Sequence, residues 1–61
     1  LQLVFWDKRI YRHYAEWIAR VGFTLSSQRP SSNILSYRKE GLSIHIDITI
    51  WADCYLMEIS G

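Results

Sequence analysis

Three side chains in the last third of the chain have types that could perform acid–base chemistry or hold a metal ion: His45, Asp47 and Glu58. His45 and Asp47 are two residues apart in an alternating segment, so their side chains share one face of a strand. If the next strand pairs so that Ile48 meets Ile59, Glu58 lies diagonal to Asp47. A histidine beside two carboxylates has the composition of a general acid–base group or a weak metal site.

These three residues also fit the polar, solvent-facing side of a sheet. A one-sided antiparallel sheet needs polar residues on its open face, and no nucleophile motif accompanies the histidine. The one cysteine, Cys54, has no cationic neighbour in sequence that would activate its thiol. We therefore predict that the chain is not an enzyme and uses no metal, cofactor or small-molecule substrate.

Length and composition indicate one small domain, residues 1–61. The net charge is +1, and no apolar run approaches the roughly 18 residues of a membrane span. A lone cysteine suits a reducing compartment, so we expect a cytoplasmic protein with no membrane partner. Three tryptophans, four tyrosines and two phenylalanines are many for 61 residues. Because aromatic residues dominate small interfaces as well as cores, this content indicates contact with another protein.

One amphipathic helix is predicted over residues 8–21. Apolar residues recur with the i, i+3, i+4, i+7 spacing of one helix face at Ile10, Tyr11, Tyr14, Trp17, Ile18 and Val21. Asp7 stands where its carboxylate can accept the free amides of the first turn. Gly22 stands where a left-handed residue ends a helix.

The remaining pattern predicts an antiparallel sheet. Residues 42–51 alternate without a fault, with Leu42, Ile44, Ile46, Ile48 and Ile50 on one face. Neighbouring strands are expected at 34–39 and 55–60, with a shorter candidate at 23–28 and an edge strand or lead-in at 1–5. The fold class is therefore α+β, with one amphipathic helix packed on a three- to four-stranded antiparallel meander.

The turn at Glu40-Gly41 leaves two registers open for the central hairpin. A three-residue loop ending on Gly41 pairs Arg38 with Leu42, and turn chemistry favours it. A two-residue loop pairs Tyr37 with Ile44 and keeps both apolar faces together. Because burial sets register most strongly, we predict the second.

The sheet face opposite the isoleucines is the predicted binding surface. Trp51 falls on this face, with Leu56 and Ile34 from the flanking strands beside it. Contiguous exposed apolar groups mark interaction surfaces, and His45, Asp47 and Glu58 would form their polar rim. The alternative is that Leu1, Leu3 and Phe5 fold over this face and cover it.

A second candidate surface is the outer side of the helix. Its basic residues are Lys8, Arg9, Arg12 and Arg20, and basic clusters contact phosphates. Glu16 lies four residues from both Arg12 and Arg20, a spacing that also suits ordinary ion pairs on a helix surface.

A family resemblance supports the second surface. From Arg20 onward the chain runs through Gly22-Phe23, a short strand, Arg29-Pro30-Ser31-Ser32-Asn33-Ile34-Leu35, Tyr37-Arg38-Lys39-Glu40-Gly41 and the apolar strand from Leu42 to Ile48. This order covers about half of the chain and resembles the HicA-type toxins, small ribonucleases with a double-stranded-RNA-binding-like fold. That family carries a Gly-Ser-His segment whose histidine performs the chemistry, and here Ser32 stands in its place. The family's closing helix has no counterpart either. The resemblance thus implies an RNA-binding relative without the family's active site.

Three functions stay open, and the one ranked last is an enzyme that uses His45, Asp47 and Glu58. The first is a small regulatory or inhibitory protein that binds another protein and associates with itself as a homodimer. The alternative is an RNA- or DNA-binding module related to the HicA-type toxins without their catalytic histidine. The sequence does not identify the partner.

Overall fold

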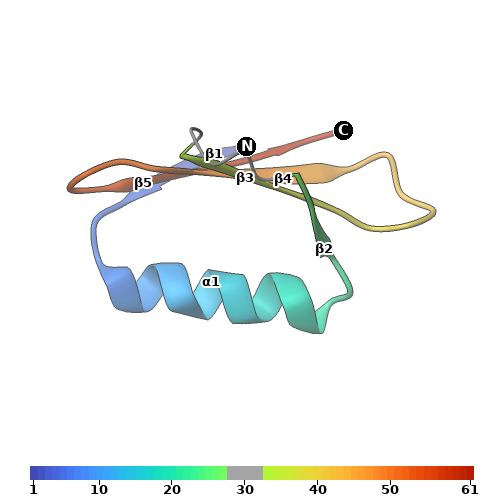
Figure 1. Ribbon diagram of the computed structural model, residues 1–61, viewed down its shortest axis with the longest axis horizontal. Coiled ribbons are helices and arrows are strands. Elements are labelled where there is room, and N and C mark those ends of the chain that lie inside the picture. The colour runs from blue at the N-terminus through green and yellow to red at the C-terminus, as the bar shows by residue number, and fades with distance from the viewer. Residues whose placement is uncertain (28–32) are drawn as a thin grey trace.

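A computed structural model describes residues 1–27 and 33–61 and contains one helix and five strands in that part of the chain (Figure 1). In chain order these are β1 (Gln2–Phe5), α1 (Lys8–Arg20), β2 (Thr24–Ser27), β3 (Ile34–Arg38), β4 (His45–Ile50) and β5 (Tyr55–Ser60). The fold is α+β, as predicted. The predicted three to four strands are fewer than the five found, because both optional segments, at 1–5 and 23–28, form edge strands.

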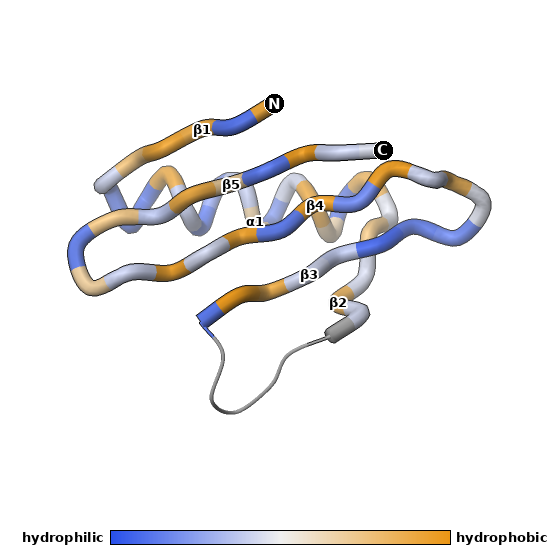
Figure 2. Tube along the Cα trace, turned by 90° about the horizontal axis from the view of Figure 1, so that it is seen from above, coloured by the Kyte–Doolittle hydropathy of each residue, from blue (hydrophilic) through white to orange (hydrophobic). Residues whose placement is uncertain are grey.

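The five strands form one antiparallel sheet in the order β1-β5-β4-β3-β2. Strands β2 to β5 are the predicted meander, and β1 lies beside β5 at the far edge (Figure 2). Helix α1 leads from β1 at one edge to β2 at the other and covers one face of the sheet (Figure 1). We call the face turned away from α1 the outer face.

Both ends of α1 are capped as the sequence predicts. The Asp7 carboxylate accepts a hydrogen bond from the Arg9 backbone N–H at 2.8 Å, which satisfies one free amide of the first turn. At the other end Gly22 has φ +97°, the left-handed conformation that ends many helices. The Lys39 ammonium donates to the Val21 carbonyl at 2.8 Å, so a cation also meets the negative end of the helix dipole.

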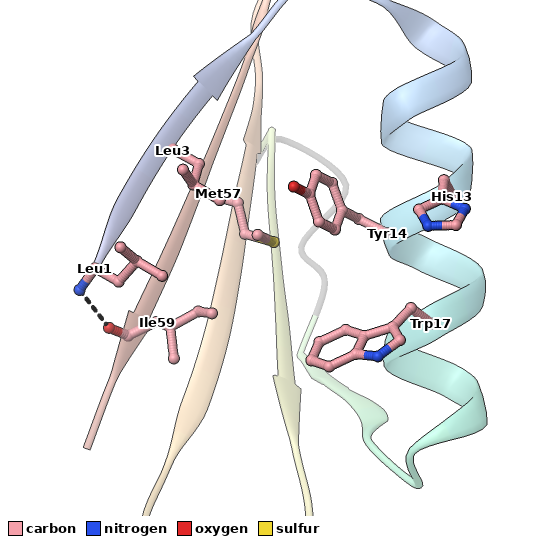
Figure 3. Close-up of a pocket in the computed structure, with 7 residues that line it drawn as sticks. All are labelled: Leu1, Leu3, His13, Tyr14, Trp17, Met57 and Ile59. Carbon is pink, nitrogen blue, oxygen red and sulfur yellow. Dashed lines mark hydrogen bonds between the residues drawn. The ribbon is translucent and has the colours of Figure 1, made fainter.

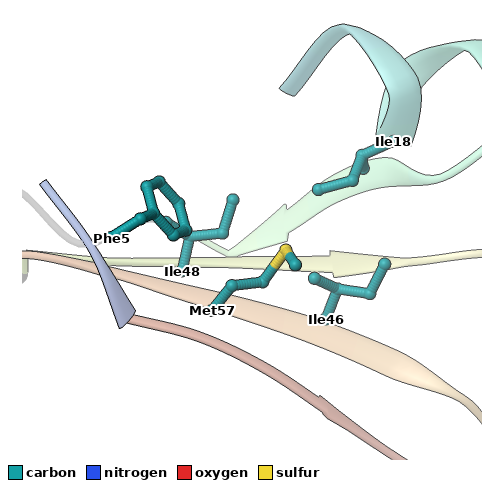
Figure 4. Close-up of a cluster of buried hydrophobic side chains, with 5 residues drawn as sticks. All are labelled: Phe5, Ile18, Ile46, Ile48 and Met57. Carbon is teal, nitrogen blue, oxygen red and sulfur yellow. The ribbon is translucent and has the colours of Figure 1, made fainter. Parts of the chain in front are cut away.

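The core lies between α1 and the sheet. The buried side chains are Phe5, Ile18, Ile46, Ile48 and Met57 (Figure 4). Ile18 is fully buried on the helix and points toward the sheet residues of this cluster (Figure 4). Aromatic rings extend the cluster, because Tyr55 stacks on Phe5 with ring centroids 5.4 Å apart and on Tyr11 at 4.7 Å. The isoleucine face is therefore the covered face, as predicted.

The central hairpin differs from the predicted register by two residues. Tyr37 pairs with Ile46, and pairing ends where Arg38 meets His45. The Leu42 N–H donates to the Lys39 carbonyl at 3.1 Å, so the predicted turn at Glu40-Gly41 does form. Gly41 takes φ +85° at the third position of this turn, as in type II turns, which splay the strands they join. The apolar faces are unchanged, because a shift of two preserves alternation.

Candidate protein-binding face

On the outer face, the side chains of cross-strand partners form rows that run across the strands. One row is mostly apolar and consists of Val4, Leu56, Thr49 and Ile34, which are successive cross-strand partners. We call this set the apolar row. Trp51 follows β4 and lies beside this row, two residues beyond Thr49, where its N–H donates to the Cys54 carbonyl at 2.9 Å and so continues the ladder. The structure therefore brings together Trp51, Leu56 and Ile34, the predicted patch residues.

The apolar row is accessible. Val4 is 49% exposed, Ile34 41% and Trp51 45%. Leu56 and Thr49 are half-buried between their neighbours. Exposed apolar residues are common when they stand singly, but these side chains are adjacent, as in an interaction surface.

The N-terminal segment does not cover the outer face. Leu3 pairs with Met57 and Phe5 with Tyr55, so both side chains point to the helix side, and Phe5 is 7% exposed. The alternative in which Leu1, Leu3 and Phe5 fold over Trp51 is therefore wrong. Strand β1 instead adds Val4 to the apolar row, a residue that the sequence analysis missed. The signal was present, because Val4 alternates with inward Leu3 and Phe5.

The predicted polar residues lie beside the apolar row but do not form a cluster around one point. Asp47 lies directly opposite Glu58, not diagonal to it, because Ile48 pairs with Met57 rather than Ile59. Glu58 accepts a hydrogen bond from the Gln2 side-chain amide at 3.0 Å. His45 lies one row further along, away from the apolar row, and shares a hydrogen bond of 2.9 Å with the Ser60 hydroxyl.

This arrangement does not hold an acid–base pair. In the described part of the chain His45 contacts the Ser60 hydroxyl, and neither carboxylate contacts its ring. In the two described stretches, 1–27 and 33–61, no three histidine, cysteine or acidic side chains converge as metal ligands. The three residues lie on one face, as the alternation predicts, and form a polar border to the apolar row.

Cys54 lies at the start of β5 and is half-buried. Partial burial raises the pKa of its thiol, and the neighbouring Asp53 carboxylate raises it further through its charge and a hydrogen bond. The thiolate is the reactive form of cysteine, so these surroundings oppose nucleophilic chemistry at this residue.

The basic residues of α1 are exposed, but they are not equivalent. Arg9 is tied to Asp7 by an ion pair with a closest distance of 2.8 Å. The hydrogen bonds from the Arg9 side chain and backbone lower the pKa of Asp7, and the same pair raises the pKa of Arg9. Lys8, Arg12 and Arg20 are exposed. Within residues 1–27 and 33–61 the predicted ion pairs from Glu16 are not present, since Arg9–Asp7 is the pair that forms there.

Ser32 and Arg29, which carry part of the HicA-type resemblance, lie outside the described residues. No helix in the described part of the chain is both long and apolar enough to cross a membrane. The chain matches no protein-family model, no curated protein and no solved structure.

Proposed function

We propose that this domain acts by binding another protein through its outer face, as a small regulatory or inhibitory module. The observation that carries the proposal is the apolar row, a line of three apolar side chains and one threonine across four strands on the face that α1 leaves open. A sheet face with no binding role would carry polar side chains at these positions.

The tryptophans support the same proposal. Trp6 is 67% exposed, Trp17 46% and Trp51 45%, so the buried core is built from isoleucines, Phe5 and Met57 instead. Leaving an indole in water gives up the burial of a large apolar surface. Tryptophan is also among the residues most enriched at the energetic centres of interfaces. Trp51 lies beside the apolar row, two residues beyond Thr49 on the same face, and is the anchor in this proposal.

The charge beside the apolar row indicates which kind of partner it would bind. Asp47 and Glu58 border the apolar row, and no cation pairs with either of them among residues 1–27 and 33–61. A partner that places an apolar side chain on Leu56 and a lysine or arginine over the two carboxylates would match both rows. Complementary charges of this kind increase association rates and select among partners.

The test compares two tryptophan variants of equal exposure. The immobilised domain is used to capture proteins from its source lysate, and the Kd of the captured protein is then measured for Trp51→Ala and Trp17→Ala. We expect Trp51→Ala to raise the Kd at least about tenfold, as interface anchors do, and Trp17→Ala to leave it unchanged. Trp17 is the matched control because it lies on the helix side, with nearly the same exposed fraction.

Equal Kd values for the two variants, with the fold intact by circular dichroism, would overturn the proposal. A second test places a charge in the row. Leu56→Glu should abolish capture, whereas Leu42→Glu should not, because Leu42 lies in the β3–β4 loop, away from the row, and is 50% exposed.

The second candidate function is nucleic-acid binding by α1. The observation that favours it is that Lys8, Arg12 and Arg20 are exposed without carboxylate partners among the described residues. Fluorescence anisotropy with short RNA and DNA duplexes tests it. Arg12→Gln together with Arg20→Gln should weaken binding and flatten its salt dependence by about two charge units, while Trp51→Ala should have no effect. Wild-type protein that binds neither duplex at low salt would exclude this function.

A further inference from the structure

The two edges of the sheet are protected to different degrees. Strand β2 carries a register shift between Leu25 and Ser27, and such bulges hinder the addition of another strand. Strand β1 pairs with β5 in regular register over its whole length. Its sequence, Gln-Leu-Val-Phe, contains no charge and no proline. It therefore lacks the charges, prolines and bulges with which many proteins block an open edge.

Hydrogen bonding shows which backbone groups this edge offers. Leu1 and Ile59 form two backbone hydrogen bonds with each other. The Leu1 amino group donates to the Ile59 carbonyl at 3.0 Å, and the Ile59 N–H donates to the Leu1 carbonyl at 2.9 Å. Alternate residues of an antiparallel strand bond to the same side, so Leu1, Leu3 and Phe5 bond to β5. The N–H and C=O groups of Gln2 and Val4 then point away from the sheet.

An apolar groove runs beside the same edge, between β1 and α1 (Figure 3). Its volume is about 300 Å³, and it is lined by Leu1, Leu3, His13, Tyr14, Trp17, Met57 and Ile59. Figure 3 shows Trp17 reaching from the helix toward the sheet at this groove. Ile10 lies two helical turns before Trp17 on the same flank and is 41% exposed. Leu1, Ile10 and Trp17 are exposed apolar residues on the helix side of this edge.

We infer that β1 is the self-association surface of this protein, and that its occupant is the β1 strand of a second copy in antiparallel pairing. A twofold axis at Leu3 puts Leu3 opposite Leu3 of the second copy and Gln2 opposite Val4 of the second copy. The outward groups of Gln2 and Val4 then satisfy one another, because each such pair exchanges two hydrogen bonds. Both helices lie on one side of the joined sheet, and the Ile10–Trp17 flanks face each other.

Charge and side-chain character favour a second copy over a charged peptide. The side chains of β1 carry no charge, so no like-charged side chains face each other across the twofold axis. The nearest acidic residue on the sheet, Glu58, lies on β5, so the two Glu58 residues are separated by three strand spacings, about 14 Å. That exceeds the Debye length of about 8 Å at physiological salt, so their repulsion is screened. The outer face stays free in this dimer, and the inference does not depend on the proposed function.

Sedimentation velocity over a range of concentrations tests the inference, with Val4→Pro as the disrupting variant. Proline at this position keeps the β1–β5 ladder, because the N–H it removes points outward. We expect a dimer for the wild type and at least about tenfold weaker association for Val4→Pro, which loses hydrogen bonds on both sides of the twofold axis. Val4→Thr, which keeps the N–H, should remain dimeric. A wild type that stays monomeric at millimolar concentration, or a folded Val4→Pro that dimerises normally, would overturn the inference.

Cross-linking gives a result even if Val4→Pro does not fold. In a Cys54→Ser background, Leu3→Cys should oxidise to a covalent dimer, because residues facing each other across the axis lie within disulfide reach. Leu25→Cys on the β2 edge is the matched control and should remain monomeric. Equal cross-linking of the two variants would count against β1 as the interface. Trp51→Ala should leave the dimer intact, so the two surfaces can fail independently.

Discussion

Asp47 and Glu58 lie directly opposite each other on β4 and β5, and within the two described stretches no cation pairs with either carboxylate. Like charges at directly opposed positions of an antiparallel pair are destabilising. The domain therefore gives up stability on the face that we propose binds a partner. Such a cost is expected at functional positions, where local rules of stability are broken.

The first prediction follows from this pair. Asp47→Asn removes one charge with little change of shape, so it should raise the free energy of unfolding by about 0.2–1 kcal/mol. Chemical denaturation at low salt measures it, and the gain should shrink at high salt because screening already weakens the repulsion. Asp53→Asn is the control, since Asp53 lies in the β4–β5 turn outside the pair. An unchanged or lower stability for Asp47→Asn would show that the pair is not repulsive.

The second prediction compares two isoleucines two residues apart. Ile46 is 2% exposed, whereas Ile44, before β4 begins, is 42% exposed. Ile46→Ala should cost about 2–5 kcal/mol, because it removes buried methyl groups and leaves a cavity. Ile44→Ala should cost less than about 1 kcal/mol. Urea denaturation of both variants checks this. Similar losses would mean that the sheet continues through Ile44 and that the predicted register with Tyr37 is the real one.

The sequence was sufficient for the helix, the strand faces and the side of the sheet on which Trp51 lies, because each depends on a local period. It was not sufficient for the register of β3 on β4. Alternation is satisfied equally by any shift of two residues, and the predicted turn forms although strand pairing ends at Arg38 and His45. The position of β1 beside β5 could not be predicted either, since pairing of strands at opposite ends of the chain leaves no local sequence pattern. Alternation with Leu3 and Phe5 indicates the face on which Val4 lies, but its pairing with Leu56 could not be predicted. Glu58 was placed one pair away from its true partner.

The third prediction separates the backbone strain from the side-chain contact that an added methyl group would cause at a glycine. Gly22 and Gly41 have φ of +97° and +85°, a conformation that L-residues with a side chain rarely adopt. A Cβ at Gly22 would lie 3.3 Å from Lys39 Cε, but a Cβ at Gly41 would have no atom within 4 Å. Gly41→Ala should therefore cost about 1–2 kcal/mol from backbone strain alone.

Gly22→Ala should cost more than Gly41→Ala, since the new methyl group also displaces the lysine that donates to the Val21 carbonyl. Thermal and urea denaturation of both variants measure the difference. The double variant Gly22→Ala with Lys39→Ala removes the contact between the new methyl group and the lysine. Its stability should fall below that of Lys39→Ala by the same amount as the stability of Gly41→Ala falls below that of the wild type. A Gly22→Ala variant as stable as the wild type would show that the helix ends without a left-handed residue.

The last prediction concerns the dependence of stability on pH at the start of α1. Hydrogen bonds from Arg9 lower the pKa of Asp7 below its ordinary value of 3.8. The folded state therefore binds fewer protons than the unfolded state, so this carboxylate contributes stability that rises with pH. The contribution is fully present above the unfolded-state pKa and is lost as the pH falls through the lowered folded-state pKa.

Asp7→Asn tests this charge, because asparagine keeps an acceptor for the Arg9 N–H but carries no charge. The wild type should unfold at a higher urea concentration than Asp7→Asn at pH 7, and the gap should close as the pH is lowered through and below 3.8. In an Arg9→Met background, Asp7→Asn should no longer change the urea midpoint in this pH range, since the guanidinium is the group that stabilises the charged carboxylate. High salt should narrow the gap at pH 7, because both side chains are exposed to solvent. A gap that persists unchanged at pH 2 would mean that Asp7 stabilises the helix through its shape and hydrogen bond alone.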